Sequence, residues 1–192
     1  MNLNKKQNDE RHRRIFTRSE ARITGVLYLI YFLTTISAEI MKGSRFDKYS
    51  NGVNLIAFAF YIAVTILFFY MFKPVNGLIS AIAALCSLSG CVIGAISLFY
   101  LPLLQINPLL FFAPYCLLIG YLIYKSAFLP RVLGVLMMLA GLGWVVFLSP
   151  LGKYISIYLE VLGVLAEGSF MLWLLARGIS VGQFKERQKP TA

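Results

Sequence analysis

Six long apolar stretches, none of which contains a Lys or an Arg, dominate this chain of 192 residues. At about 1.5 Å of rise per residue, most of them are long enough as helices to cross roughly 30 Å of hydrocarbon. Segments of this kind must be helical, because lipid offers no solvent for unpaired backbone groups. We therefore predict an all-α fold, an integral membrane bundle of six transmembrane helices. The predicted spans are residues 23–41, 53–72, 75–99, 108–124, 132–149 and 154–175.

The basic residues are distributed as in a membrane protein, although a net charge of +10 taken alone would also suit a nucleic-acid-binding protein. If the N-terminus is cytoplasmic, the residues that fall outside are Lys42, Arg45, Lys48 and Lys153, and the other 14 of the 18 Lys and Arg are inside. This excess satisfies the positive-inside rule. The pattern predicts that both termini are cytoplasmic and that nucleic acid is not a partner. The inverted topology is the alternative.

The chain is predicted to consist of one membrane domain and two tails. Residues 1–22 are expected to form a basic cytoplasmic tail, residues 23–178 the six-helix transmembrane domain, and residues 179–192 a cytoplasmic C-terminal tail. No A-x-A cleavage pattern follows the first span, so we expect a retained helix rather than a signal peptide. Short links make consecutive helices antiparallel neighbours. We therefore expect a multi-pass membrane protein whose first partner is the lipid bilayer.

Two glutamates, Glu160 and Glu167, lie inside the last apolar stretch. Seven residues are almost two helical turns, so these side chains share one face and stand about 10.5 Å apart along the axis. Ser156 and Gly163 fall on the same face, which favours an orientation into the bundle. An ionised carboxylate in the bilayer centre costs about 2.5 to 3.5 kcal/mol, so such residues are usually neutral, partnered or exposed to a cavity.

The first apolar stretch carries a comparable polar stripe of Tyr28, Thr35 and Glu39. In the predicted topology Glu39 and Glu160 both belong to the outer half of the membrane, so a polar chamber open to the exterior is expected, with Glu167 deeper. The glutamates would carry protons, bind a cation or an amine, or donate structural hydrogen bonds. For Glu39, near a helix end, the structural interpretation is favoured, because its carboxylate can reach headgroups or Lys42.

Signatures of an enzyme are absent from the apolar stretches, so an enzyme is the less favoured class and no catalytic residue is assigned. The single histidine, His12, lies in the tail, and no Asp occurs in any predicted span. The three cysteines have no C-x-x-C spacing, so we expect no metal site, disulfide framework or cofactor. Gly90 and Gly94 stand at G-x-x-x-G spacing, a common pattern that allows helices to approach closely within one bundle or in a homo-oligomer.

Several segments together resemble a bacterial multi-pass membrane family, the one catalogued as domain of unknown function 4386. They are ARITGVLYLI at 21–30, KPVN at 73–76, GYLIYKS at 120–126, FLPRVLG at 128–134, AGLG at 140–143, EGS at 167–169 and LWLL at 172–175. The resemblance extends from about Ala21 to Gly178, and Glu167 matches its pattern more securely than Glu160 does. It implies a helical bundle in the bacterial cytoplasmic (inner) membrane and supplies no activity, ligand or partner.

The leading functional hypothesis is a membrane protein that binds or moves a small solute, cation or proton through a bundle cavity lined by glutamates. Its candidate ligand-binding residues are Glu160, Glu167, Glu39, Tyr28, Thr35 and Ser156. The alternative is a regulatory or structural membrane protein that transports nothing and interacts with other membrane components. A further expectation concerns residues 124–131, where Lys125 and Arg131 would anchor at headgroups while Phe128 and Leu129 enter the membrane interface.

Overall fold

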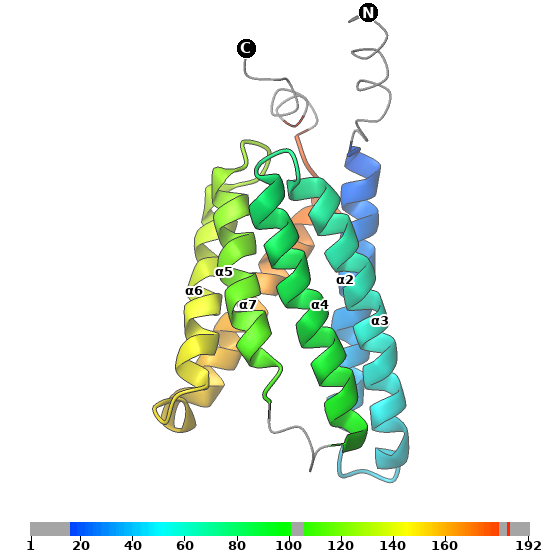
Figure 1. The fold of residues 1–192 in the computed structure, drawn as a ribbon. Coiled ribbons are helices and arrows are strands. Elements are labelled where there is room, and N and C mark those ends of the chain that lie inside the picture. Colours follow the sequence, from blue (N-terminus) through cyan, green and yellow to red (C-terminus); the bar gives the residue numbers. More distant parts are fainter. Residues whose placement is uncertain (1–15, 101–105, 181–183, 185–192) are drawn as a thin grey trace, which may run out of the picture.

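The computed structural model describes residues 16–100, 106–180 and 184, and in these residues it contains six α-helices and no strand. The helices lie roughly parallel to one another in a single bundle (Figure 1). Their bounds are α2 Arg18–Met41, α3 Asp47–Phe72, α4 Gly77–Tyr100, α5 Leu109–Lys125, α6 Arg131–Phe147 and α7 Gly152–Ala176. The prediction of an all-helical fold is confirmed for this part of the chain.

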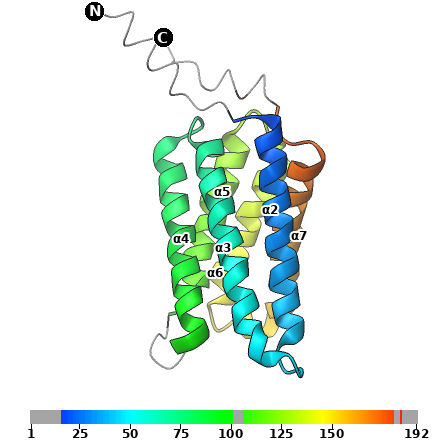
Figure 2. The same cartoon turned by 90° about the vertical axis from the view of Figure 1, so that its right-hand side faces the viewer.

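The six helices form a closed ring in chain order. Each helix packs against the next one, and α2 packs against α7 to complete the circuit (Figures 1 and 2). An even number of helices brings both ends of the described chain to one end of the bundle, where the rings of Phe16 and Phe184 lie 6.2 Å apart. We call this end the terminal face, and the other end the opposite face. Side chains that point into the ring therefore come from several helices at once.

Four of the helices, α2, α3, α4 and α7, are long and apolar enough to cross a membrane. The helices α5 and α6 are equally apolar but have 17 residues each. At 1.5 Å per residue they span about 25 Å, which lies near the lower limit for a bilayer core. Length and composition thus support a multi-pass membrane protein with four clear candidate spans, against the six that the sequence predicts.

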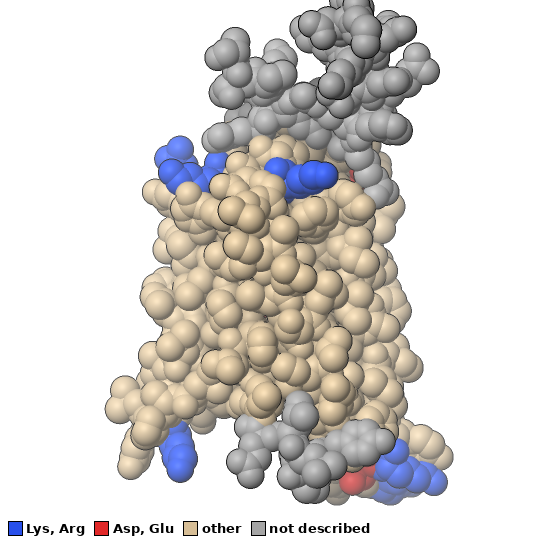
Figure 3. Space-filling view, in the orientation of Figure 1, with Lys and Arg blue, Asp and Glu red and all other residues tan. Residues whose placement is uncertain are grey.

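Charged side chains stand at the two ends of the bundle, and the surface between them is uncharged over the face shown in Figure 3. At the terminal face basic residues predominate, with Glu20 as an acidic exception, and at the opposite face basic and acidic side chains occur together. Such a belt is what hydrocarbon requires, because charged groups are stable only at headgroup level or in water.

The first helix starts earlier than its apolar stretch does. Thr17 caps α2 through a capping box, in which the Thr17 Oγ1 accepts from the Glu20 amide at 3.1 Å and the Glu20 carboxylate accepts from the Thr17 amide at 2.7 Å. The two bonds satisfy backbone donors that a helix start otherwise leaves free. The segment 18–22, which was assigned to the tail, is consequently helical. Its position on the cytoplasmic side stays a prediction.

Glycines set the closest helix contacts. A Cβ atom on Gly134 of α6 would lie 2.6 Å from the Tyr124 amide nitrogen of α5, and one on Gly120 would lie 2.8 Å from the Gly134 carbonyl oxygen. The backbones of α5 and α6 therefore approach to a distance that only glycine allows. Gly90 and Gly94 of α4 face the rings of Phe112 and Phe58, so the G-x-x-x-G row packs within the bundle.

The link between α5 and α6 does not place its apolar side chains in the membrane interface, where the sequence predicts them. Phe128 and Leu129 are buried, and the Phe128 ring lies 6.2 Å from that of Phe72 and 5.2 Å from that of Phe184. The expectation that these two side chains enter lipid was wrong, because aromatic neighbours from α3 and from the C-terminal segment cover them. The hairpin closes the terminal face of the bundle instead.

Candidate functional site

A carboxylate lies in the middle of the bundle, where three helices meet. The Tyr28 hydroxyl of α2 donates to Glu167 Oε2 of α7 at 2.6 Å, and the Cys116 thiol of α5 lies 4.0 Å from Glu167 Oε1. Glu167 is nine residues from the end of α7 at Ala176, a rise of about 13.5 Å. The carboxylate is therefore deep in the apolar belt.

Four tyrosine rings surround this carboxylate. The rings of Tyr31 and Tyr61 are 4.5 Å apart, and the Tyr61 ring is 6.0 Å from those of Tyr28 and Tyr115. Tyr28, Tyr61 and Tyr115 are buried and Tyr31 is half-buried. We call these residues the Glu167 cluster: Glu167, Tyr28, Tyr31, Tyr61, Tyr115 and Cys116. An ionised Glu167 would act electrostatically on all four hydroxyls.

Two buried hydroxyls in and beside the cluster lack a hydrogen bond of full geometry to any of the residues that the structure describes. They are Tyr115 Oη, which interacts with Tyr61, and Thr35 Oγ1, which interacts with Tyr31. An unsatisfied buried hydroxyl destabilises the folded state by about 1 to 3 kcal/mol. Such groups call for an explanation in a folded protein, and a water molecule or a polar ligand supplies one.

Glu167 is enclosed by protein atoms and yet partly accessible. It lies at the centre of the buried face of α7, together with Gly163, Phe170 and Leu174. Even so, the residue is only half-buried, so a water-sized sphere can touch part of it. Glu167 is therefore not completely covered by the residues that the structure describes.

The structure does not bring Glu160 together with Glu167. Glu160 lies two turns away on the same side of α7, but it is exposed, and Ser156 one turn further is half-buried. The reason is the course of α7, which lies beside α2 at the terminal face and diverges from it toward the opposite face (Figure 1). Ile155, where the backbone leaves helical geometry with φ −127° and ψ 16°, adds a kink at that end.

The polar stripe of α2 shows the same gradient of exposure. Tyr28 is fully buried, Thr35 is half-buried and Glu39 is exposed. Glu39 forms an ion pair with Lys42 at 2.5 Å, as the spacing of three residues allows. Both polar stripes thus become more accessible toward the opposite face, and they end in the interior at Tyr28 and Glu167.

The sequence analysis missed Tyr31, Tyr61, Tyr115 and Cys116. Each lies within an apolar stretch, where a hydroxyl or thiol is a weak signal compared with a carboxylate. Tyr61 and Tyr115 could have been singled out because they are far from both interfaces, where membrane tyrosines usually lie. Among the described residues, no group of three His, Cys, Asp or Glu side chains comes together that could hold a metal ion.

Comparisons with known proteins return proteins of unknown function. An uncharacterized protein of Archaeoglobus fulgidus is 25% identical over 126 residues, which cover 61% of this chain and 76% of that protein. No solved structure matches. The model of the family described as Domain of unknown function (DUF4386) matches residues 104–178, the region that carries α5, α6, α7 and Glu167. This region is therefore similar to the DUF4386 family, in agreement with the resemblance noted in the sequence.

Proposed function

We propose that this protein is a multi-pass membrane protein that binds a small organic cation, such as a protonated amine, at the Glu167 cluster. In this proposal all six helices cross the cytoplasmic membrane with both termini in the cytoplasm. The solute reaches the site between α2 and α7 from the opposite face, which is then the exterior. Movement of the solute or of a proton across the membrane would be the next step at the same site.

One observation carries the proposal: a single deep carboxylate lies among four tyrosine rings, and none of the six apolar stretches contains a Lys or an Arg to neutralise it. A carboxylate attracts a cation, and the faces of aromatic rings stabilise the same charge by about 2 kcal/mol or more when water is excluded. Rings that surround an ammonium group form an aromatic cage. The unpartnered hydroxyls of Tyr115 and Thr35 are available as acceptors for N–H groups.

The test compares two glutamates of one helix. Thermal stability of the purified protein is measured with monovalent cations and with a panel of small amines, for the wild type, Glu167→Gln and Glu160→Gln. A ligand that binds only the folded state at 100 times its Kd stabilises it by about 2.7 kcal/mol. We expect an amine to stabilise the wild type and Glu160→Gln, and this gain to vanish in Glu167→Gln.

Glu160→Gln is the matched control, since it removes the same charge from the same side of α7 at an exposed position. Equal loss in both variants would contradict the assignment of the site to Glu167. No stabilisation of the wild type by any member of the panel would argue against cation binding altogether.

A structural role is the second candidate, and the bond between Tyr28 and Glu167 favours it, because this bond joins α2 to α7 where the ring closes. A regulatory or structural membrane protein would use the carboxylate in this way. Glu167→Gln would then lower the thermal stability by the same amount with and without any ligand.

A further inference from the structure

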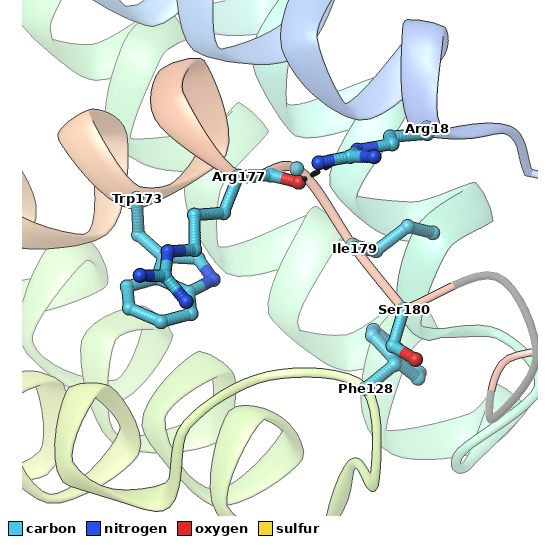
Figure 4. Close-up of a pocket in the computed structure, with 7 residues that line it drawn as sticks. Arg18, Phe128, Trp173, Arg177, Ile179 and Ser180 are labelled. Carbon is cyan, nitrogen blue, oxygen red and sulfur yellow. Dashed lines mark hydrogen bonds between the residues drawn. The ribbon is translucent and has the colours of Figure 1, made fainter.

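A hollow of about 390 Å³ opens at the terminal face, between the start of α2, the end of α7 and the α5–α6 link. Figure 4 shows its lining: the Arg18 side chain reaches toward the Arg177 carbonyl, the Arg177 side chain lies over Trp173, and Ile179 and Ser180 lie along the segment that follows, beside Phe128. The charged and polar members are Arg18, Arg177 and Ser180, and the apolar ones include Phe128, Trp173 and Ile179. It is separate from the Glu167 cluster, with which it shares no residue.

Backbone geometry fixes the shape of this hollow. Gly178 ends α7 at φ +65°, and its amide donates to the Trp173 and Leu174 carbonyls at 3.2 and 3.1 Å. A Cβ atom there would lie 3.1 Å from the Arg18 side chain in addition to straining the backbone. Beyond the turn, the Ser180 amide donates to the Phe128 carbonyl at 3.4 Å, which holds the chain over the hairpin.

Among the residues that the structure describes, most N–H donors of the two guanidinium groups have no hydrogen-bond partner. Arg18 uses its Nε–H in a 3.1 Å bond to the Arg177 carbonyl, and the Arg177 guanidinium lies 5.3 Å from the centre of the Trp173 ring. Neither has a carboxylate partner within the part of the chain that the structure describes. Two positive charges therefore face one hollow, and planar guanidinium groups match the oxygens of a phosphate in a bidentate manner.

We propose that this hollow binds the phosphate of an anionic phospholipid headgroup. It lies at the ends of the candidate spans α2 and α7, where headgroups are found when these helices cross a bilayer. The apolar wall of Phe128, Trp173 and Ile179 suits the glycerol and the first methylenes of an acyl chain, which a free inorganic anion does not have. A Trp at this level is typical of contact with the headgroup region.

The test uses the full chain in detergent and three probes: dioctanoyl phosphatidylglycerol, dioctanoyl phosphatidylcholine and inorganic phosphate. Binding is followed by thermal shift and by lipid adducts in native mass spectrometry. We expect phosphatidylglycerol to bind more tightly than phosphatidylcholine. In Arg177→Gln and in Arg18→Gln its binding should weaken about fivefold, the factor that corresponds to about 1 kcal/mol for each basic residue near an anionic surface.

Arg131→Gln is the matched control. Arg131 is also exposed at the terminal face and lies 5.8 Å from the centre of an aromatic ring, that of Tyr124, but it does not line the hollow. It should keep wild-type affinity. Equal affinity for the two lipids would overturn the proposal, as would an equal loss in Arg131→Gln. An effect of inorganic phosphate alone as large as that of phosphatidylglycerol would identify a site for free anions instead and would also overturn it.

Discussion

Among single residues, Tyr28 and Glu167 have the clearest claim to importance, because their hydrogen bond lies deep in the apolar belt and joins the first described helix to the last. Water does not compete for these groups in hydrocarbon. Even so, hydrogen bonds between membrane helices contribute only about 0.6 kcal/mol on average and up to about 1.7 kcal/mol, because the unfolded chain finds other partners in the membrane. The contribution of this pair is thus measurable but modest.

Tyr28→Phe removes the donor and keeps the ring. We expect it to lower the free energy of unfolding by about 0.6 to 1.7 kcal/mol, since the ring contacts remain and only the bond to Glu167 is lost. Unfolding of the detergent-solubilised protein by denaturant measures this difference. Tyr121→Phe, at a largely exposed ring of α5, should change the stability by less than about 0.5 kcal/mol. Equal effects of the two substitutions would count against the Tyr28 contact.

The residues of the site could be predicted only in part from the sequence. The helical period predicts that Glu160 lies on the side of α7 that carries Glu167, yet Glu160 is exposed and Glu167 is half-buried. Periodicity gives the angle of a side chain around its own helix but not the crossing angle between helices, which decides how far along that face the packing continues. Tyr61 and Tyr115 join the cluster through α3 and α5, and no local pattern links those segments.

Among the elements, α5 and α6 pack backbone against backbone within the family-matched region, and three glycines, Gly120, Gly134 and Gly141, make this close approach possible. The short link and the small residues of this pair are visible in the sequence, and they are sufficient to predict antiparallel neighbours. The start of α2 could also have been read from the pattern T-x-x-E at 17–20, a capping box that an analysis based on apolarity alone passes over. The burial of Phe128 could not, because it depends on Phe72 and Phe184, which are distant in sequence.

Gly134→Ala tests the close contact of α5 and α6. Its methyl group would meet the backbone of Tyr124 and Gly120 rather than flexible side chains, so we expect a loss of about 1 to 3 kcal/mol of stability. Gly168→Ala is the control within α7, where nothing lies within 4 Å of the added atom. It should be neutral or slightly stabilising, because alanine favours the helix. Thermal unfolding of both variants measures the contrast, and comparable losses would refute the steric explanation.

At the scale of the whole molecule, the Glu167 cluster and the basic hollow lie at different levels of the bundle. The polar residues that lie on the same helix sides as the Glu167 cluster become more exposed toward the opposite face, whereas the basic hollow lies at the terminal face beside the ends of the described chain. If the terminal face is cytoplasmic, as the distribution of basic residues predicts, the hollow contacts inner-leaflet lipid and the cluster opens toward the exterior. This arrangement depends on how many helices cross the membrane. The helices α5 and α6 are short enough to lie outside the hydrocarbon core, so the chain has either four or six spans.

Labelling of single cysteines distinguishes four crossings from six. The cysteines are introduced one at a time into a variant in which Cys86, Cys91 and Cys116 are replaced by Ala. With six, a membrane-impermeant thiol reagent added to intact cells should label Lys48→Cys and Lys153→Cys but should label Arg131→Cys only after permeabilisation. With four, α5 and α6 stay on the side where α4 ends, and Arg131→Cys is labelled in intact cells. We expect the six-helix result, because 17 apolar residues still meet the lower limit for a span and because the contacts of α6 with α5 and α7 extend along the bundle (Figure 1). Labelling of Arg131→Cys without labelling of Lys153→Cys would show the inverted topology, and the Glu167 cluster would then open toward the cytoplasm.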